Sequence, residues 1–395
     1  MAISRKIEQY MTKASWIRKM FEEGGKLRAR YGEENVFDYT LGNPIVEPPA
    51  LVKQVLRDLA EEPVAGMHRY MSNAGYESTR TAVARYLSGL FDLPFDMQHI
   101  VMTVGAGGGL NVTLKALLNA GDEVIINSPF FVEYKFYLDN HGGMPVVVPT
   151  SEDFALDPDA IRRAITAKTR VVLVNSPNNP TGVIYSRDCL AGVAAVLREA
   201  EETHGAPIYL VSDEPYRKIV YDGADCPSIL HAHPNSIIIT SHSKDLALPG
   251  ERIGYIAVNP ALDGVQQLMN ALIFCNRTLG FVNAPALQQR IVERCVQEGV
   301  DIGFYQEKRD MLFEGLTALG YEVVKPQGTF YMFPRSPLVD DVAFVNRALA
   351  KRLLLVPGAG FGTPGYFRIA YCTVQNQTIE RSLPIFAELI KASRV

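Results

Sequence analysis

The sequence has few cysteines, no strong charge imbalance and no long apolar run. The cysteines are scattered and odd in number, which is typical of reduced thiols and argues against a disulfide framework or a cysteine-based metal site. They are Cys189, Cys226, Cys275, Cys295 and Cys372. With 39 basic and 43 acidic residues, the net charge of -4 provides no basic surface for nucleic acid. No stretch is apolar enough to cross a membrane, and residues 1–8 lack the apolar core of a signal peptide. We therefore expect a cytoplasmic protein that binds neither nucleic acid nor membranes.

The composition is that of a globular protein, and a chain of 395 residues is long enough for two domains. In the middle of the chain, short apolar runs alternate with helical patterns, which predicts an α/β fold with a mostly parallel sheet and helices on both faces. Seven strands are expected, at 100–103, 123–127, 145–149, 171–175, 208–212, 237–240 and 255–258. The intervening helices are expected at 110–119, 133–140, 158–167 and 187–203. Ligands of such sheets bind at the carboxyl ends of the strands.

The two ends of the chain show a mixed pattern that predicts a second, smaller α+β domain. Helices are expected there at 15–30, 342–351 and 378–392, with one long helix at 286–319 that ends at Gly320. Two further helices, at 49–59 and 77–91, belong to the large domain. Short strands are expected at 37–41, 321–325, 329–333, 353–357 and 366–371. We predict an N-terminal segment (1–47) that packs with the small domain, a large domain (48–284) and the small domain itself (285–395).

One lysine lies among groups that suit a phosphate ester. Lys244 follows Ser241 and Ser243 and precedes Arg252, and the whole stretch lies between two apolar runs. Such a lysine is either a solvated loop residue or a desolvated amine with a lowered pKa that forms a Schiff base. Two hydroxyl groups and a guanidinium favour the second interpretation, because they bind phosphate oxygens. A Schiff-base lysine beside a phosphate site suggests pyridoxal phosphate (PLP).

This stretch resembles the lysine signature of the class I and II aminotransferases of PLP fold type I. In that family the pattern is Ser-x-Ser-Lys followed by Gly-x-Arg-x-Gly, and both parts occur here around Lys244 and Arg252. The resemblance implies that Lys244 is the Schiff-base lysine and proton carrier, and that Ser241, Ser243 and Arg252 bind the phosphate. It also implies a large PLP-binding domain and a homodimer.

A glycine-rich segment at 103–110 predicts a turn between a strand and a helix. Backbone N–H groups at a helix N-terminus bind phosphate, so Ala106 and Gly107 are candidate cofactor contacts. A dinucleotide-binding turn is the alternative. It is disfavoured because Leu110 occupies the position of the last glycine of that motif, and because no acidic residue ends the next strand.

The segment at 175–182 matches the Asn-Pro-Thr-Gly turn of the family at the end of a strand. Residues of these types also build ordinary turns. The resemblance implies that Asn179 donates a hydrogen bond to the phenolic oxygen of the cofactor and contributes to the substrate site.

Asp213 ends an apolar strand, where a buried carboxylate would keep the ring nitrogen of the cofactor protonated. Glu214 is the competing acid, but strand alternation directs it to the other face. By resemblance, Tyr216 would hydrogen-bond the same phenolic oxygen as Asn179. Lys244, Asp213 and Tyr216 are therefore the predicted catalytic residues.

Four further positions complete the predicted site. Phe131 matches the aromatic residue that stacks on the cofactor ring, although two adjacent phenylalanines are also typical of a core. Tyr70 matches the tyrosine that reaches the phosphate of the neighbouring subunit, and Gly42 lies in a Gly-Asn-Pro segment that lines the substrate site of the family or forms a plain turn. Arg368 lies among apolar residues and needs an anionic partner, either a substrate α-carboxylate or a structural ion pair.

The histidines give no sign of a metal site. His231 and His233 precede a strand and are expected in a solvated turn, and His242 is given no catalytic role. None of them has the acidic or thiol neighbours of a typical metal centre.

The predicted function is PLP-dependent transamination, in which the amino group of an L-amino acid passes to a 2-oxo acid by a ping-pong mechanism. A PLP-dependent lyase or synthase (of the C–S lyase or aminocyclopropane-carboxylate synthase type) is the alternative on the same scaffold. A binding role, as in transcription factors with aminotransferase-like domains, is disfavoured by the lack of a basic patch. The donor stays open: aspartate-specific relatives carry a lysine where this chain has Gly107, or an arginine from the partner subunit near the position of Arg277.

Overall fold

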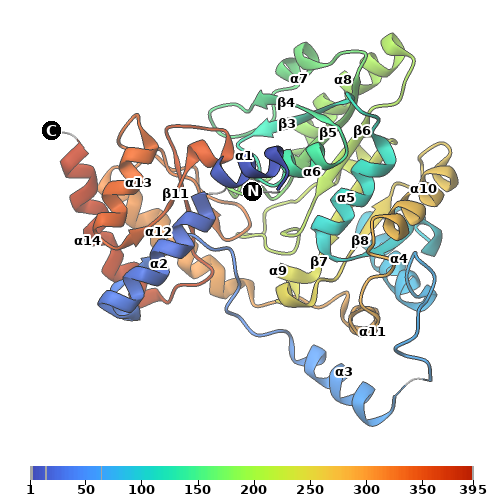
Figure 1. Cartoon of the computed structure of the whole chain (residues 1–395), viewed down its shortest axis with the longest axis horizontal. Coiled ribbons are helices and arrows are strands. Elements are labelled where there is room, and N and C mark those ends of the chain that lie inside the picture. Colours follow the sequence, from blue (N-terminus) through green and yellow to red (C-terminus); the bar gives the residue numbers. More distant parts are fainter. Residues whose placement is uncertain (1–2, 14–15, 64, 394–395) are drawn as a thin grey trace.

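The computed structural model describes residues 3–13, 16–63 and 65–393 (Figure 1). Its centre is a seven-stranded sheet in the order β2-β8-β7-β6-β5-β3-β4, in which β8 runs antiparallel to both neighbours and the other pairs are parallel. The strands are β2 (Ile100–Thr103), β3 (Glu123–Ser128), β4 (Met144–Pro149), β5 (Thr169–Asn175), β6 (Tyr209–Asp213), β7 (Ser236–Ser241) and β8 (Gly254–Val258). The predicted mostly parallel sheet is confirmed.

Apolar side chains cover both faces of this sheet. Neighbouring residues of β5 illustrate the alternation of the pleat: Val171 and Val172 belong to apolar clusters on opposite faces. A sheet buried on both sides requires continuous apolar strands, and β-branched residues dominate β5 and β7. The helices around the sheet are α3 (Ala50–Glu61), α4 (Glu77–Phe91), α5 (Gly105–Leu117), α6 (Tyr134–Asn140), α7 (Pro158–Ala164), α8 (Arg187–His204), α10 (Val265–Thr278) and α11 (Ala286–Cys295).

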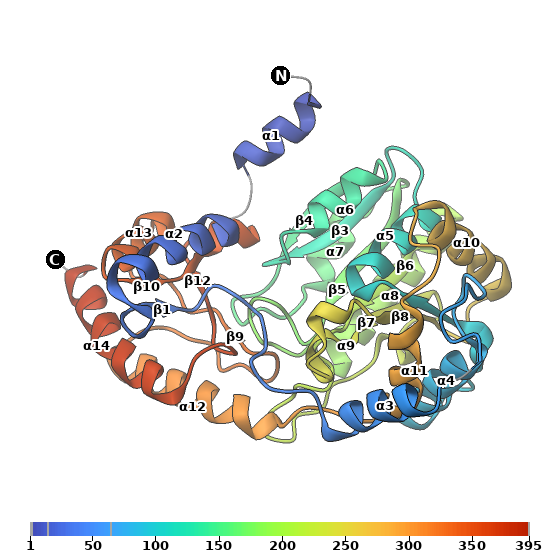
Figure 2. The same cartoon turned by 60° about the horizontal axis from the view of Figure 1, so that its bottom comes forward.

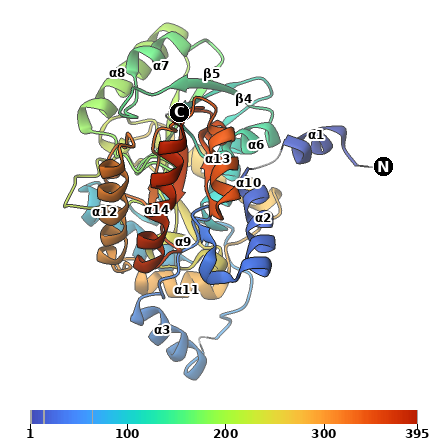
Figure 3. The same ribbon diagram turned by 90° about the vertical axis from the view of Figure 1, so that its left-hand side faces the viewer.

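A smaller unit combines the two ends of the chain. β1 (Phe37–Asp38) pairs in parallel with β10 (Leu353–Leu354), as Figure 2 shows. A second small sheet has the order β11 (Val356–Pro357), β12 (Phe367–Ala370), β9 (Tyr331–Met332). Figure 3 shows the helices of this unit in front: α2 (Trp16–Tyr31), α12 (Ile302–Leu319), α13 (Asp341–Ala350) and α14 (Asn376–Ser393). The remaining N-terminal helix is α1 (Arg5–Lys13). The boundaries proposed at 47/48 and 284/285 stay predictions.

Four local expectations were wrong. The strand expected at 353–357 is two short strands, β10 and β11, which belong to different sheets. The glycine-rich segment is not a turn that precedes a helix at 110, because α5 begins at Gly105 and the glycines form its first turn. The long helix expected at 286–319 is two helices, since Asp301 caps α12 by accepting a hydrogen bond from the Gly303 N–H. Residues 321–325 do not form a strand. Within the described ranges, no helix combines the length and apolar character that crossing a membrane requires.

Candidate active site

A cavity of ≈ 320 Å³ lies at the carboxyl ends of the central strands, where the sheet meets the smaller unit. All the predicted site residues except Tyr70 line it: Gly42, Ala106, Gly107, Phe131, Asn179, Asp213, Tyr216, Ser241, Ser243, Lys244, Arg252 and Arg368. Further lining residues are Thr40, Leu110, Tyr137, Asn175, Pro215, Pro249 and Tyr331. The cavity therefore collects residues from across the chain.

Lys244 belongs to a short helix, α9 (His242–Asp245), that follows β7. Its Nζ donates a hydrogen bond to the carbonyl oxygen of Gly42 at 2.6 Å. Burial lowers the pKa of Lys244 to about 8, and the cationic Arg252 and Arg368 act in the same direction. A substantial fraction of this amine is therefore neutral, and nucleophilic, near neutral pH.

Asp213 lies at the end of β6 with one oxygen bonded and the other bare. Tyr134 donates a hydrogen bond to its Oδ2 at 2.7 Å, whereas its buried Oδ1 has no hydrogen-bond partner. Burial raises the pKa of Asp213 to about 7, although the bond from Tyr134 lowers it. An uncompensated buried carboxylate is costly, so Oδ1 is suited to a cationic N–H donor. Glu214 points elsewhere and pairs with Arg217 at 2.5 Å.

The turn after β5 is tied to the end of β6. Asn175 is in register with Asp213, donates to its carbonyl oxygen at 2.7 Å, and accepts the Asn179 N–H at 2.7 Å. The Asn179 Oδ1 accepts a hydrogen bond from Arg368 Nη1 at 3.1 Å. This orientation leaves the amide N–H groups of Asn179 as donors toward the cavity.

Arg368 comes from β12 and is only 2% exposed. Its Nη2 donates to the carbonyl oxygen of Thr40 at 2.6 Å, and its Nε has no hydrogen-bond partner. The guanidinium lies between the rings of Tyr331, at 4.6 Å, and Phe361, at 4.8 Å. Burial lowers the pKa of Arg368. Among the described residues no carboxylate pairs with it, so the structural ion pair that was the alternative for this arginine is not observed.

The first turn of α5 forms the opposite end of the cavity. A Cβ at Gly105, which has a φ of 65°, would lie 2.8 Å from Arg252 Nη2. Arg252 itself has a left-handed φ of 53° and donates to the Pro249 carbonyl oxygen at 3.0 Å. With Ser241 and Ser243 on the same wall, unpaired helix N–H groups, hydroxyls and a guanidinium converge there, which is the composition of a phosphate site.

Close packing explains the glycine at position 42. A Cβ there would lie 1.8 Å from the Tyr331 hydroxyl, so only glycine lets the chain pass at this point. The same hydroxyl lies 3.1 Å from that of Tyr216. Phe131 packs edge-on against Tyr134 with its ring beside the cavity. Tyr70, in contrast, is 89% exposed and lies outside the cavity of the single chain.

The expectation for His233 was wrong. Its side chain is buried, and its Nε2 lies 3.1 Å from the Ile208 carbonyl oxygen, so it belongs to the core and not to a solvated turn. His242 is also buried, with Nδ1 at 3.1 Å from Asp245 Oδ2, and it does not line the cavity.

Some residues that line the cavity, or that bond to its lining residues, were missed by the sequence analysis. Asn175 and Tyr134 had a usable signal, because one shares a strand end with Asp213 and the other follows Phe131 by three residues. Tyr331 and Tyr137 had none, since nothing local to their segments indicates which side chain faces the site.

Comparison with known proteins covers nearly the whole chain. Residues 34–384 match the family model described as aminotransferase class I and II. The aspartate/prephenate aminotransferase of Thermus thermophilus is 31% identical over 89% of this chain and 90% of its own length. The aspartate aminotransferase of Pyrococcus horikoshii is 30% identical over 94% and 93%.

Solved structures give the same picture. A crystal structure of an amino transferase from Eubacterium rectale superimposes with a TM-score of 0.97, at 38% identity and with 100% of both chains covered. The aspartate aminotransferase from Thermus thermophilus with maleate has a TM-score of 0.85 at 28% identity, covering 98% of this chain and 100% of that one.

Proposed function

The chain belongs to the class I and II aminotransferase family and is an aminotransferase, and from this premise we propose that it moves the amino group of an L-amino acid to a 2-oxo acid with PLP held at Lys244. One observation carries the proposal. Three unusual groups line the same cavity. They are the amine of Lys244, whose pKa is lowered, the carboxylate of Asp213, which has one oxygen without a partner, and the buried guanidinium of Arg368, which has no carboxylate partner. Each of these groups is energetically costly without a ligand.

The residues present fit PLP at each of its functional groups. The bare Oδ1 of Asp213 suits the ring N–H, because a pyridinium supplies both the missing hydrogen bond and the missing charge. The first turn of α5 with Arg252 suits the phosphate, and the amine of Lys244 suits the aldehyde. When bound, PLP supplies an electron sink that stabilises negative charge at the substrate Cα.

Lys244 is proposed to carry the proton. Once the substrate amine has displaced it, its side chain removes the proton from the substrate Cα, and in the reverse half-reaction it returns one. A pKa of about 8 is close to the operating pH, so the amine both accepts and releases a proton readily. The hydrogen bond to the Gly42 carbonyl oxygen shows a resting partner for the same group.

Arg368 is proposed to grip the α-carboxylate of the substrate. Its present partners, the Asn179 and Thr40 oxygens, are neutral and hold the guanidinium without compensating its charge. A bidentate carboxylate would supply that charge and fix the orientation of the Cα–H bond toward Lys244. Because the same arginine receives amino acids and 2-oxo acids, the two half-reactions of a ping-pong mechanism use one site.

The charges in the cavity bear on which amino acids can act as the donor. The cations among the lining residues are Lys244, Arg252 and Arg368, and each already has a proposed task. Relatives of the chain are named for aspartate, prephenate and aromatic amino acid substrates. A dicarboxylate donor would need one more cation, for which the exposed Arg277 of a second copy is the candidate.

We propose a homodimer in which Tyr70 reaches the phosphate site of the other copy. The support is that a tyrosine ring 89% exposed is unusual for a single chain, since its apolar area gains from burial. The cytoplasmic location stays a prediction.

The visible spectrum of the purified protein with PLP tests the proposed function. We expect an absorption band of the lysine-bound cofactor. This band should bleach when one amino acid of a panel (glutamate, aspartate, alanine and phenylalanine) is added, and it should return when a 2-oxo acid is added. In Lys244→Ala the band of the lysine-bound cofactor should be absent. A band that no donor changes reversibly would favour a lyase, and a protein that shows no band with added PLP would contradict the proposal.

A further inference from the structure

Tyr137 lines the cavity but has no role in the reaction derived above. It comes from α6, and its side chain is half-buried. Its hydroxyl approaches the first turn of α5: a Cβ at Gly107 would lie only 3.1 Å from it. Among the described residues this hydroxyl forms no hydrogen bond, whereas those of Tyr134, Tyr216 and Tyr331 do.

The groups around the Tyr137 hydroxyl are donors. The first N–H groups of α5 have no partner within the helix, and Gly107 lies among them. Arg252 presents Nη2 to the same turn from the side of Gly105. The carbonyl oxygen of Gly107 is already bonded to the Asn111 side chain at 2.9 Å. These donors gather at one turn, and the Tyr137 hydroxyl bonds to none of the described acceptors, which indicates an anionic ligand.

The phenol is protonated at neutral pH, which makes it a donor as well. Burial, together with the charges of Glu133 and Asp213, raises the pKa of Tyr137 to about 12 against the opposing charge of Arg252. Replacing the O–H with hydrogen would leave the ring in place, so the hydroxyl can be tested apart from the packing.

We propose that Tyr137 is an additional ligand of the cofactor phosphate, with its O–H donating to a phosphate oxygen bound at the first turn of α5. This inference rests on the proposed function, because it assumes that PLP occupies the cavity. It adds to the predicted phosphate contacts (Ala106, Gly107, Ser241, Ser243 and Arg252) a residue from α6. It also explains why position 107 is glycine, since a larger side chain would displace the phenol.

Binding of PLP and of pyridoxal, which lacks the phosphate, to the cofactor-free protein separates this role from a general effect. In Tyr137→Phe we expect the Kd of PLP to rise about tenfold, the fold-change for a lost hydrogen bond to a charged group. The Kd of pyridoxal should be unchanged. Inorganic phosphate should compete with PLP about tenfold more weakly in the variant than in the wild type. Tyr209→Phe is the matched control, since Tyr209 is also half-buried but does not line the cavity.

The outcomes distinguish this inference from the function on which it rests. Equal weakening of PLP and pyridoxal would show that Tyr137 supports the cavity and does not contact the phosphate. Unchanged binding of both would also contradict the inference and leave the proposed function intact. A wild-type protein that binds neither compound would overturn the proposed function and this inference with it. Thermal melting of each variant checks that it is folded.

Discussion

Arg309 and Arg368 are both almost completely buried, at 0% and 2% exposure, and both lie over tyrosine rings. Their partners differ. Arg309, on α12, contacts two carboxylates: its Nη1 lies 2.9 Å from Asp222 Oδ2 and its Nε 2.8 Å from Asp310 Oδ1. Arg368 contacts only neutral oxygens, those of the Asn179 side chain and the Thr40 carbonyl.

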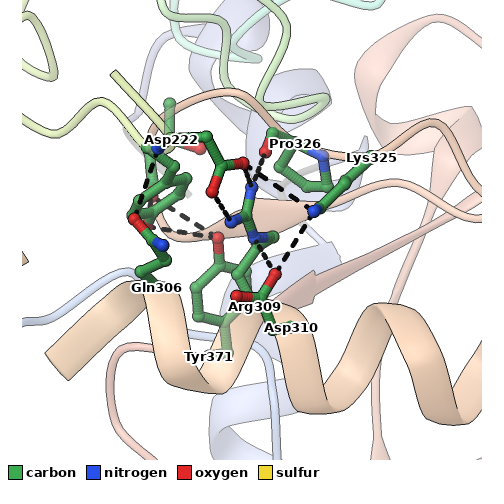
Figure 4. A network of polar contacts seen from close by, with 9 residues as sticks. Asp222, Gln306, Arg309, Asp310, Lys325, Pro326 and Tyr371 are labelled. Carbon is green, nitrogen blue, oxygen red and sulfur yellow. Dashed lines mark hydrogen bonds and ion pairs between the residues drawn. The ribbon is translucent and has the colours of Figure 1, made fainter. Parts of the chain in front are cut away.

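Figure 4 shows how completely the Arg309 network (Arg309, Asp222, Asp310, Lys325) is connected. Arg309 also donates to the Pro326 carbonyl oxygen at 2.8 Å, and Lys325 contacts both carboxylates. Burial lowers the pKa of Arg309, but the two carboxylates outweigh it and raise the pKa overall. The network joins the loop at Asp222 to α12, and it supplies the carboxylate partners of Arg309 from within the chain.

The pKa of Arg368 is instead lowered by burial, because no carboxylate compensates its charge. A buried cation that the fold leaves without an anion costs free energy, and a ligand that supplies an anion recovers part of that cost. The comparison therefore teaches that burial alone does not mark a binding site. A missing counter-charge on a residue that lines the cavity does, and the same test identifies Asp213, which lines the cavity and whose Oδ1 is bare.

Asp213→Asn tests whether an unpaired charge in the cavity serves a ligand, and it should cause the largest loss of activity among the substitutions considered. Without the carboxylate the ring nitrogen loses its proton, so we expect kcat to fall about 10³-fold, the scale of a lost preorganised electrostatic contact. The cofactor-free protein should melt at a higher temperature than the wild type at pH 8. The reason is that a folded-state pKa of about 7, above the unfolded value, makes the ionised carboxyl destabilising as the pH rises. Equal melting temperatures at pH 8 would contradict this account of Asp213.

Arg368→Leu should damage function and spare the fold. We expect kcat/KM for the best amino acid to fall about 10²-fold, because two charge-assisted hydrogen bonds to the α-carboxylate are lost. The thermal stability without substrate should be unchanged or higher, since an uncompensated buried charge has been removed. Steady-state kinetics and calorimetry on the same preparation measure both quantities. A strongly destabilised variant with normal kcat/KM would reverse the assignment.

Arg309→Leu should show the opposite pattern. We expect a loss of about 2 kcal/mol in the free energy of unfolding. This is less than the roughly 3–5 kcal/mol for breaking a fully buried ion pair, because Asp222 and Asp310 are partly exposed and regain water. Once the protein is folded, kcat/KM should stay within about threefold of the wild type, since Arg309 does not line the cavity. Denaturant unfolding measures the first and kinetics at low temperature the second. An Arg309→Leu variant that is as stable as the wild type but inactive would contradict the claim that Arg309 serves stability and Arg368 serves substrate binding.

The pH dependence of PLP capture tests whether burial in the cavity also lowers the pKa of Lys244. The neutral amine is the nucleophile, and its pKa is lowered to about 8. The rate at which the cofactor-free protein captures PLP should therefore rise with pH up to about 8 and then level off, with a change of nearly tenfold between pH 6.5 and 7.5. Stopped-flow absorbance measures it. A rate that keeps rising to pH 10 would mean that burial does not lower this pKa.

Much of the fold could be predicted from the sequence because the central strands are continuous apolar runs separated by helical patterns. The strands were placed to within a residue or two at most ends, since burial on both faces leaves no other pattern. The errors have physical causes. Glycine has a low helix propensity, which hid the start of α5 at Gly105, and one capping side chain, Asp301, divided the expected long helix.

The candidate site was predictable where its residues follow strand ends. Asn179, Asp213 and Lys244 do so, and chain topology alone brings them together. Tyr331 could not be found in this way, because it reaches the cavity from the smaller unit, 115 residues after its partner Tyr216. The burial of His233 was also hidden, since it depends on packing against Ile208 and not on its own neighbours in sequence.

The role of Arg368 is tested most directly by two substrates and one substitution. The substrates are the best amino acid donor and the amine that differs from it only in lacking the α-carboxylate. For the wild type we expect single-turnover rates that favour the amino acid by about 10²-fold or more, and for Arg368→Leu a ratio near one with the rate of the amine unchanged. A variant that keeps the wild-type preference for the carboxylate would contradict the claim that this buried arginine is left unpaired for the substrate.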